Sequence, residues 1–203
     1  MKALSVFVVE LDKLINDTIN VGGKEMFIDT RFEMGEFNNR VNEGVITSPP
    51  VKYNTGAKKG DTLYFHHHVV LQWGQKLFGN DSNDKQYVCM YDNESIMANQ
   101  AIAYKCQDTG EVHPFDGWII MTPHKDERVS SSDIIEEVYL KENKTHKGRL
   151  AFENSSSKDL GINLKEIVVF KEGIAYPFKI DGEDYIRVSS EMVDYVQEEV
   201  HDA

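Results

Sequence analysis

Three consecutive histidines, His66, His67 and His68, are the side chains best suited to chemistry, because imidazole nitrogens bind transition metals. They follow an apolar run that ends at Phe65, and this pattern predicts the end of a strand. Successive side chains of a strand point to opposite faces, so His66 and His68 would face one side and His67 the other. At most two of them could then share an ion. We therefore predict no metal site and interpret the three histidines as a polar strand end.

The other reactive side chains show no catalytic spacing. The cysteines, Cys89 and Cys106, stand alone, which predicts reduced and buried thiols. The serine runs at 130–132 and 155–157 are interpreted as flexible loop residues. The sequence contains no glycine-rich phosphate loop, nucleophile elbow or paired catalytic motif. We therefore predict a protein that is not an enzyme and has no cofactor.

Length and charge limit the classes of partner. A chain of 203 residues suits two domains of about 100 residues each. With 34 acidic and 22 basic residues the net charge is −12, which disfavours binding to nucleic acid or anionic membrane. No apolar run approaches the ~18 residues of a membrane helix, and the N-terminal apolar stretch is too short for a signal peptide. These features predict a cytoplasmic protein.

The elements that must position these residues are strands. Apolar residues follow a period of two, and clusters of Gly, Asn, Asp and Ser separate the runs, which predicts an all-β barrel or sandwich. Helix is expected only as single turns near 93–97 and 190–193. The predicted strands are residues 4–9, 44–47, 62–65, 87–91, 118–122, 149–152, 167–170 and 185–189.

Four of these blocks recur in the same order about one hundred residues later, which indicates an internal repeat. One more apolar strand follows the last block of each copy. We therefore predict two domains, residues 1–106 and 112–203, joined by the polar stretch 107–111. The matching blocks are 6–9 with 118–121, 43–46 with 147–150, 61–65 with 166–170, and 87–90 with 185–188.

Each copy has a long connection, at about 12–40 and 124–147, that shows no period-two strand. Long loops in compact domains are usually functional or disordered. Both are polar, yet each contains bulky apolar residues that loops seldom expose to solvent. These are Met26, Phe27 and Ile28 after Gly22 and Gly23, and Ile134 and Ile135 after the serines.

In these blocks the sequence resembles, twice over, the GroES-like chaperonin-10 family of co-chaperonins. The second copy opens with His-Pro-Phe-Asp-Gly-Trp-Ile-Ile at 113–120, similar to the family's Pro-Leu-x-Asp-x-Val-x-Val. Residues 58–65, Lys-Lys-Gly-Asp-Thr-Leu-Tyr-Phe, resemble the family's Val-Gly-Asp-x-Val strand. The stretches 87–97 and 185–195 resemble its closing strand, turn and strand. Together the two matches cover nearly the whole chain.

The resemblance implies two tandem GroES-like β-barrels with long mobile loops. It implies a homo-oligomeric ring that caps a GroEL-like chaperonin, which alone binds ATP, and so assists protein folding. Each mobile loop would dock an apolar tripeptide in a groove of the chaperonin. Met26, Phe27 and Ile28 stand at that position in the first copy. In the second copy Ile134 and Ile135 fit best, with Val138, Tyr139 and Leu140 as the second choice.

One turn departs from the family's pattern, and the family's pattern also predicts how the terminal strands pair. Lys165 and Glu166 stand where the family has Gly-Asp, so we expect that turn to be built differently. In the family, the first strand of one subunit pairs with the last strand of its neighbour. Here the last strand of the first copy, near 98–104, would pair with 118–121 within the chain. Residues 4–9 and 195–200 would then pair between chains.

A second function class remains open from the sequence. The chain could be a non-enzymatic β-barrel interaction or assembly protein, for example a viral one, that binds no chaperonin. The two classes differ in their loops, because a co-chaperonin must suppress chaperonin ATPase or support refolding through them.

Overall fold

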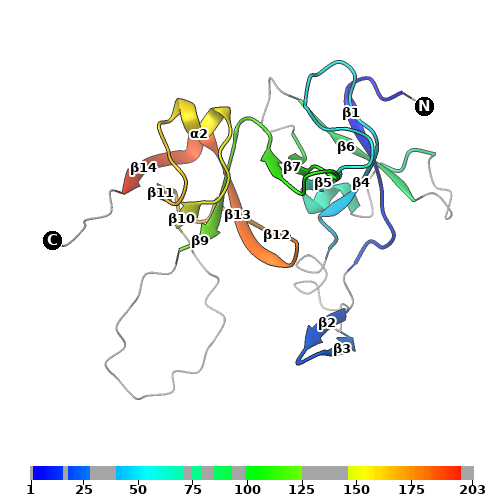
Figure 1. Cartoon of the computed structure of the whole chain (residues 1–203), viewed down its shortest axis with the longest axis horizontal. Helices are drawn as coiled ribbons and strands as arrows, with labels where there is room; N and C mark the ends of the chain where they lie inside the picture. Colours follow the sequence, from blue (N-terminus) through cyan, green and yellow to red (C-terminus); the bar gives the residue numbers. More distant parts are fainter. Residues whose placement is uncertain are drawn as a thin grey trace. The chain divides into compact units, whose positions relative to one another are not determined.

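The computed structural model describes residues 2–15, 18–27, 40–70, 75–78, 85–92, 99–124 and 146–197. Over these residues the chain is mostly β-strand, with one five-residue α-helix and two short 3-10 helices (Figure 1). The strands form two six-stranded antiparallel sheets and a separate two-stranded hairpin. The predicted all-β class is therefore confirmed. No helix in this part of the chain is long and apolar enough to span a membrane.

The chain divides into two compact units, Met1–Phe115 and Asp116–Ala203. The elements of the first unit are β1 (Val6–Glu10), β2 (Thr18–Val21), β3 (Lys24–Phe27), β4 (Glu43–Ser48), β5 (Thr62–Phe65), η1 (His67–Val70), β6 (Gln86–Met90), β7 (Ala101–Lys105) and β8 (Val112–Pro114). Those of the second are β9 (Trp118–Pro123), β10 (Lys147–Leu150), α2 (Ser155–Asp159), β11 (Ile167–Phe170), β12 (Tyr176–Ile180), β13 (Glu183–Ser189), η3 (Ser190–Met192) and β14 (Val193–Gln197).

Five strands have the same order in the two sheets. The first has the order β6-β1-β4-β5-β7-β8 and the second β12-β13-β9-β10-β11-β14. Each predicted strand overlaps one of these strands. The sequence repeat equates β1, β4, β5, β6 and β7 with β9, β10, β11, β13 and β14, and these five strands have the same order in both sheets. Residues 75–77 also pair with the outer edge of β6, as β12 pairs with β13, through the Leu77 N–H to Gln86 O bond of 2.8 Å.

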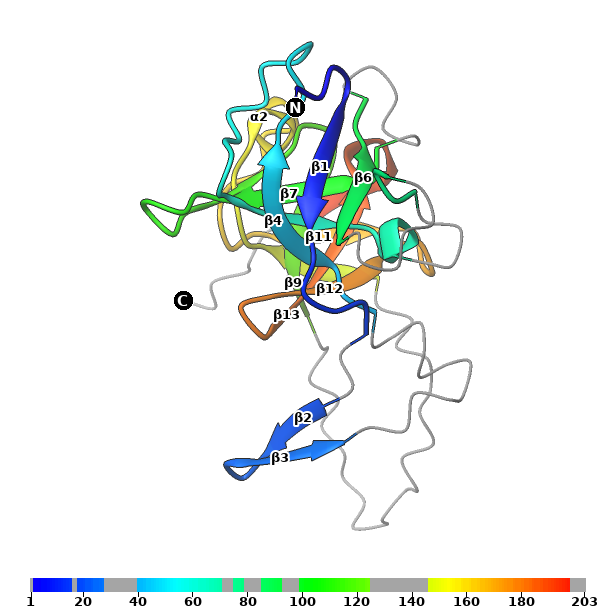
Figure 2. The ribbon, with the colours of Figure 1, turned by 90° about the vertical axis from the view of Figure 1, so that its right-hand side faces the viewer.

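The first strand of each copy lies inside its sheet. β1 pairs with β4 on one side and β6 on the other (Figure 2), and β9 pairs likewise with β10 and β13. Phe7, Val8 and Val9 are fully buried, as are Ile119, Ile120 and Met121 in β9. Burying a large apolar side chain contributes about 1.5–3 kcal/mol. Each sheet is therefore built around this strand.

This arrangement corrects the pairing expected for assembly. Residues 4–9 cannot add a strand from a neighbouring chain, because both edges of β1 are already hydrogen-bonded within the unit. The last strand of the first copy, β7, pairs with β5 and β8 and not with β9. Both predicted pairings of these strands are therefore wrong. The short strand β8, which precedes the first strand of the second copy, covers the outer edge of β7 instead.

Phe115 ties the segment after β8 to the first unit. Its ring is buried, with centroid distances of 5.5 Å to Phe7, 5.2 Å to Tyr91 and 5.6 Å to Tyr104. Its N–H donates to the Ile102 carbonyl at 3.0 Å. The division between the units therefore falls between Phe115 and Asp116, whereas the polar composition places it at 107–111.

The turn before β11 is the same turn as the one before β5. The carboxylate of Asp61 accepts from the Lys58 N–H at 2.7 Å, and that of Glu166 accepts from the Asn163 N–H at 2.9 Å. The residue before each carboxylate also has left-handed backbone geometry, with φ of 97° at Gly60 and 70° at Lys165. The expectation of a different turn is wrong, because Lys165 adopts the conformation that glycine has in the first copy.

The serines at 155–157, interpreted as flexible loop, form helix α2. Asn154 is its N-cap: the side-chain oxygen accepts from the Ser157 N–H at 2.9 Å, and Ser157 Oγ accepts from the Asn154 N–H at 3.1 Å. Such a capping box satisfies two N–H groups at the start of a helix. The Asn154 amide also donates to the Trp118 carbonyl at 2.9 Å, which ties the helix to β9. The flexible-loop interpretation of this serine run is therefore wrong.

The left-handed turns give a paired test by mutation. A non-glycine residue in this conformation strains the folded state by roughly 1–2 kcal/mol. Glycine avoids the strain, but it makes the unfolded chain more flexible, which offsets part of the gain in stability. We expect Lys165→Gly to raise the free energy of unfolding by about 0.5–1 kcal/mol. Gly60→Ala should lower it by about 0.5–1 kcal/mol or more, because it adds the same strain and its Cβ would also meet the end of the Gln107 side chain. Urea unfolding of both variants measures these changes, and stabilisation by Gly60→Ala would contradict the equivalence of the two turns.

Candidate functional site

The long connection after β1 contains a β-hairpin. β2 and β3 pair antiparallel with Thr18 opposite Phe27 and Val21 opposite Lys24. Gly22 and Gly23 connect them with φ of 59° and 80°, as a two-residue type I′ turn requires. The expectation that 12–40 lacks strands is therefore wrong for 18–27. A Gly-Gly pair between two short β-forming runs is a hairpin signal that could have predicted this.

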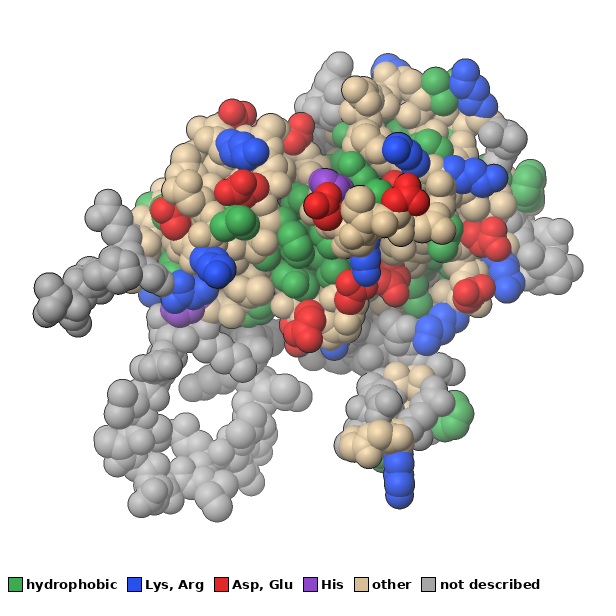
Figure 3. Space-filling view, in the orientation of Figure 1, with side chains coloured by type: hydrophobic (Ala, Val, Ile, Leu, Met, Phe, Trp, Pro, Cys, Tyr) green, Lys and Arg blue, Asp and Glu red, His purple; other side chains and the backbone are tan. Residues whose placement is uncertain are grey.

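The hairpin exposes large apolar side chains. Phe27 is 84% exposed, more than any other large hydrophobic side chain of the described residues, and Met26 is 53% exposed. Figure 3 shows hydrophobic surface standing out from this hairpin, whereas acidic and basic side chains are interspersed over both units in the view. Successive residues of a strand face opposite sides, so Met26 and Phe27 project from opposite faces of the hairpin. Ile28 lies outside the described residues.

In each unit, the two ends of the long connection lie next to each other at the ends of paired strands. In the first unit the Val41 N–H donates to the Leu14 carbonyl at 3.0 Å, and Ile15 forms a bridge with Arg40. In the second unit the His124 N–H donates to the Lys147 carbonyl at 3.2 Å. The residues predicted to bind a partner in the second connection lie outside the described part of the chain; they are Ile134, Ile135, Val138, Tyr139 and Leu140.

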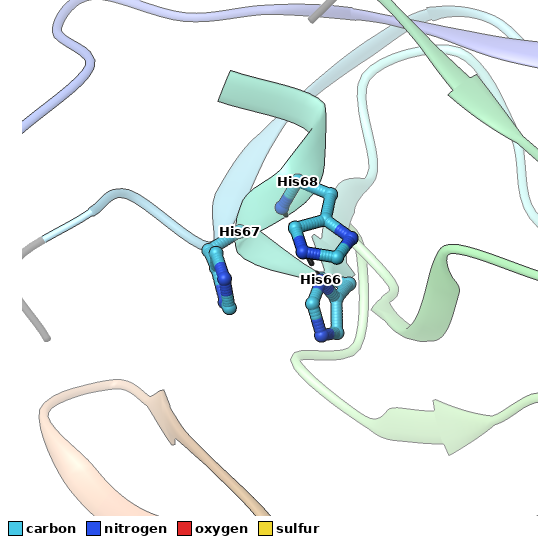
Figure 4. A group of neighbouring side chains, drawn as sticks. All are labelled: His66, His67 and His68. Atoms are coloured by element: carbon cyan, nitrogen blue, oxygen red, sulfur yellow. Dashed lines mark hydrogen bonds between the residues drawn. The ribbon is translucent and has the colours of Figure 1, made fainter. Parts of the chain in front are cut away.

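The three histidines lie at the junction of β5 and η1, where the predicted strand does end at Phe65. His67 and His68 begin the 3-10 helix η1, so the strand alternation assumed for them is wrong. The ring centroids are 4.3 Å apart for His66 and His67, 4.2 Å for His66 and His68, and 4.8 Å for His67 and His68. Figure 4 shows the three rings around this junction, with His66 and His68 next to each other and His67 apart from them in the view. All three imidazoles can therefore reach one point.

The two cysteines differ in environment. Cys89 is fully buried in β6, and this burial raises the pKa of its thiol far above the usual value. Cys106 is only partly buried, and hydrogen bonds from Thr109 and from the Asp108 backbone lower the pKa of its thiol. Both thiols are free, as predicted, but only Cys89 is buried.

Comparison with protein-family models and with curated proteins finds no match to this chain. The function must therefore be inferred from the repeat, from the exposed apolar hairpin and from the chemistry of the histidines. The hairpin is the candidate site for binding a partner, because it presents Phe27 to solvent on an element with its own hydrogen-bonded frame.

The cysteines differ in a way that a thiol reagent can measure. The thiolate is the reactive form, and a lowered pKa increases its population near neutral pH. We expect an aromatic disulfide reagent at pH 7–8 to modify one thiol per native chain, Cys106. The Cys106→Ser variant should react only after denaturation exposes Cys89. Rapid modification of native Cys106→Ser would contradict the burial of Cys89.

Proposed function

We propose that this protein is a co-chaperonin that caps a ring-shaped, ATP-driven chaperonin and so assists protein folding. The observation that carries the proposal is Phe27, a large apolar side chain 84% exposed on a hairpin between the first two strands of the first sheet. The twofold resemblance to the chaperonin-10 family supplies the partner class. The co-chaperonin catalyses no reaction, and the chaperonin alone binds ATP.

The energetics of such a contact suit a cap that must bind and release. Burying one Phe side chain contributes about 1.5–3 kcal/mol. Ordering a flexible chain costs roughly 1–2 kcal/mol per residue. The hairpin is already ordered by its own hydrogen bonds, so binding costs less conformational entropy there. Each contact therefore stays weak. Several contacts on one ring bind tightly through effective concentration, and all release together when the partner's grooves move.

The proposal assigns the chaperonin contact to Met26, Phe27 and Ile28 in the first connection. Phe27 is the main anchor, because Met26 faces the other side of the hairpin and is less exposed. In the second connection the assignment is Ile134 and Ile135, with Val138, Tyr139 and Leu140 as the alternative set.

Ring assembly follows from an edge strand of the second sheet. β14 is the counterpart of β7, whose outer edge is covered by β8, the segment just before β9. Among the described residues, the outer edge of β14 has no strand partner. Unpaired strand edges favour pairing with another chain. We infer that a strand of a second copy covers the outer edge of β14, which places the counterpart of the β7–β8 contact between chains and builds a ring.

Replacing Phe27 tests the contact with the chaperonin. Phe27→Asp places a charge in an apolar groove, so binding to a chaperonin ring with ATP should weaken at least tenfold, a loss of about 1.4 kcal/mol or more. Met26→Asp should have a smaller effect. Binding is measured by co-sedimentation with the chaperonin, and client refolding is the functional readout.

Val51→Asp is the matched control, because Val51 is 52% exposed, as Met26 is, but lies between β4 and β5. It should bind as the wild type does, and circular dichroism should be unchanged in all variants. Full binding by Phe27→Asp would contradict the residue assignment. If the wild-type protein binds no chaperonin from its own host, the protein is an interaction or assembly protein instead.

Sedimentation velocity tests the assembly. The chain has a mass of 23.2 kDa, and at micromolar concentration we expect a discrete species of several times this mass. Pairing of β14 with a second copy gives a head-to-tail contact that closes only at a fixed number of chains. A stable 23.2 kDa monomer under these conditions would contradict the ring.

A further inference from the structure

We propose that His66, His67 and His68 form a binding site for one divalent transition-metal ion of the Zn²⁺, Ni²⁺ or Cu²⁺ class. Each residue offers one ring nitrogen, and these three atoms lie within 4.8 Å of one another. This site is independent of the proposed contact with a chaperonin.

The backbone geometry brings the three rings together. A 3-10 helix has three residues per turn, so η1 turns His67 and His68 away from the alternation of a strand. His66 is the residue between β5 and η1, and its ring lies 4.2–4.3 Å from the other two by centroid. A metal–imidazole bond is about 2.0–2.1 Å, so two nitrogens on one tetrahedral ion lie about 3.4 Å apart. Side-chain rotations that bring the three nitrogens, now within 4.8 Å of one another, closer together would close the site.

The fold holds the backbone of the site from both ends. Phe65 before it and Val69 and Val70 after it are buried. The His66 N–H donates to the Gln100 carbonyl at 2.9 Å, and the Val69 N–H donates to the His66 carbonyl at 3.1 Å. A ligand set on a fixed backbone loses less conformational entropy when the ion binds.

The side chains remain accessible to an ion from solvent. His66 and His67 are half-buried and His68 is exposed. The Nδ1 atom of His66 accepts from the backbone N–H of His68 at 3.3 Å, which links two of the three histidines directly. Three imidazoles occupy three positions of a tetrahedral ion and leave the fourth for water or another ligand.

The donor atoms determine the class of metal. Imidazole suits Zn²⁺, Ni²⁺ and Cu²⁺, whereas Mg²⁺ and Ca²⁺ prefer carboxylate and carbonyl oxygens. The cluster consists of histidines alone, so it should discriminate against Mg²⁺ and Ca²⁺. The net charge of −12 favours the approach of a cation.

Isothermal titration of the full chain, freed of metal by a chelator, with Zn²⁺ and Ni²⁺ tests the site. We expect one ion per chain with micromolar or tighter affinity, and no comparable binding of Mg²⁺. The double variant His67→Asn, His68→Asn should bind at least tenfold more weakly. His124→Asn, which removes a histidine in the second unit, is the matched control and should bind as the wild type does.

Thermal unfolding supplies a readout that separates loss of ligands from loss of fold. Because a ligand of the native state stabilises it by mass action, Zn²⁺ should raise the melting temperature of the wild type and of His124→Asn. At the same Zn²⁺ concentration the melting temperature of the double variant should rise by less, and its circular dichroism without metal should match that of the wild type. The proposal would be overturned if the wild type showed no saturable binding at metal concentrations up to about 100 µM. Equal affinity in the double variant would overturn it as well.

Discussion

The structure depends on one strand in each copy that is hydrogen-bonded along both edges and buried. β1 and β9 hold this place, with β4 and β6 or β10 and β13 at their sides. Gly44 and Gly148 stand at equivalent positions of the next strand, where the chains approach closely: a Cβ on Gly148 would lie 2.7 Å from the Met121 Cβ, and one on Gly44 would clash with Leu11. These paired strands anchor both ends of each long connection, so the connection can carry a binding function without disturbing the core.

The repeat and the strands could be predicted from the sequence, because a sheet that buries a face imposes a period of two on its apolar residues. What could not be predicted from that period depends on local hydrogen bonds. The helix at Ser155–Asp159 needs the reciprocal bonds of Asn154 and Ser157, and the turn at Lys165 follows the first copy despite the missing glycine. The hairpin β12–β13 could have been predicted from Asp181-Gly182, a typical two-residue hairpin turn, but the period-two pattern alone does not include turn residues.

The candidate sites were predictable to different degrees. Residue type alone identified Met26 and Phe27, since bulky apolar residues stand out in a polar connection. Their division between two faces, with Phe27 as the more exposed, required the hairpin geometry. The histidines show the reverse: their type was evident, but the assumption of a strand separated rings that η1 brings together. Where a strand ends decides which side chains can share a ligand.

We propose that chains with two copies of one β-domain assemble into a ring that binds a chaperonin through apolar side chains on the long connections. Electron microscopy of the protein mixed with its host's chaperonin and ATP tests this claim most directly. We expect a closed ring of these chains over an end of the chaperonin cylinder, and the same ring in the protein alone. Uncapped cylinders beside free single chains would contradict it.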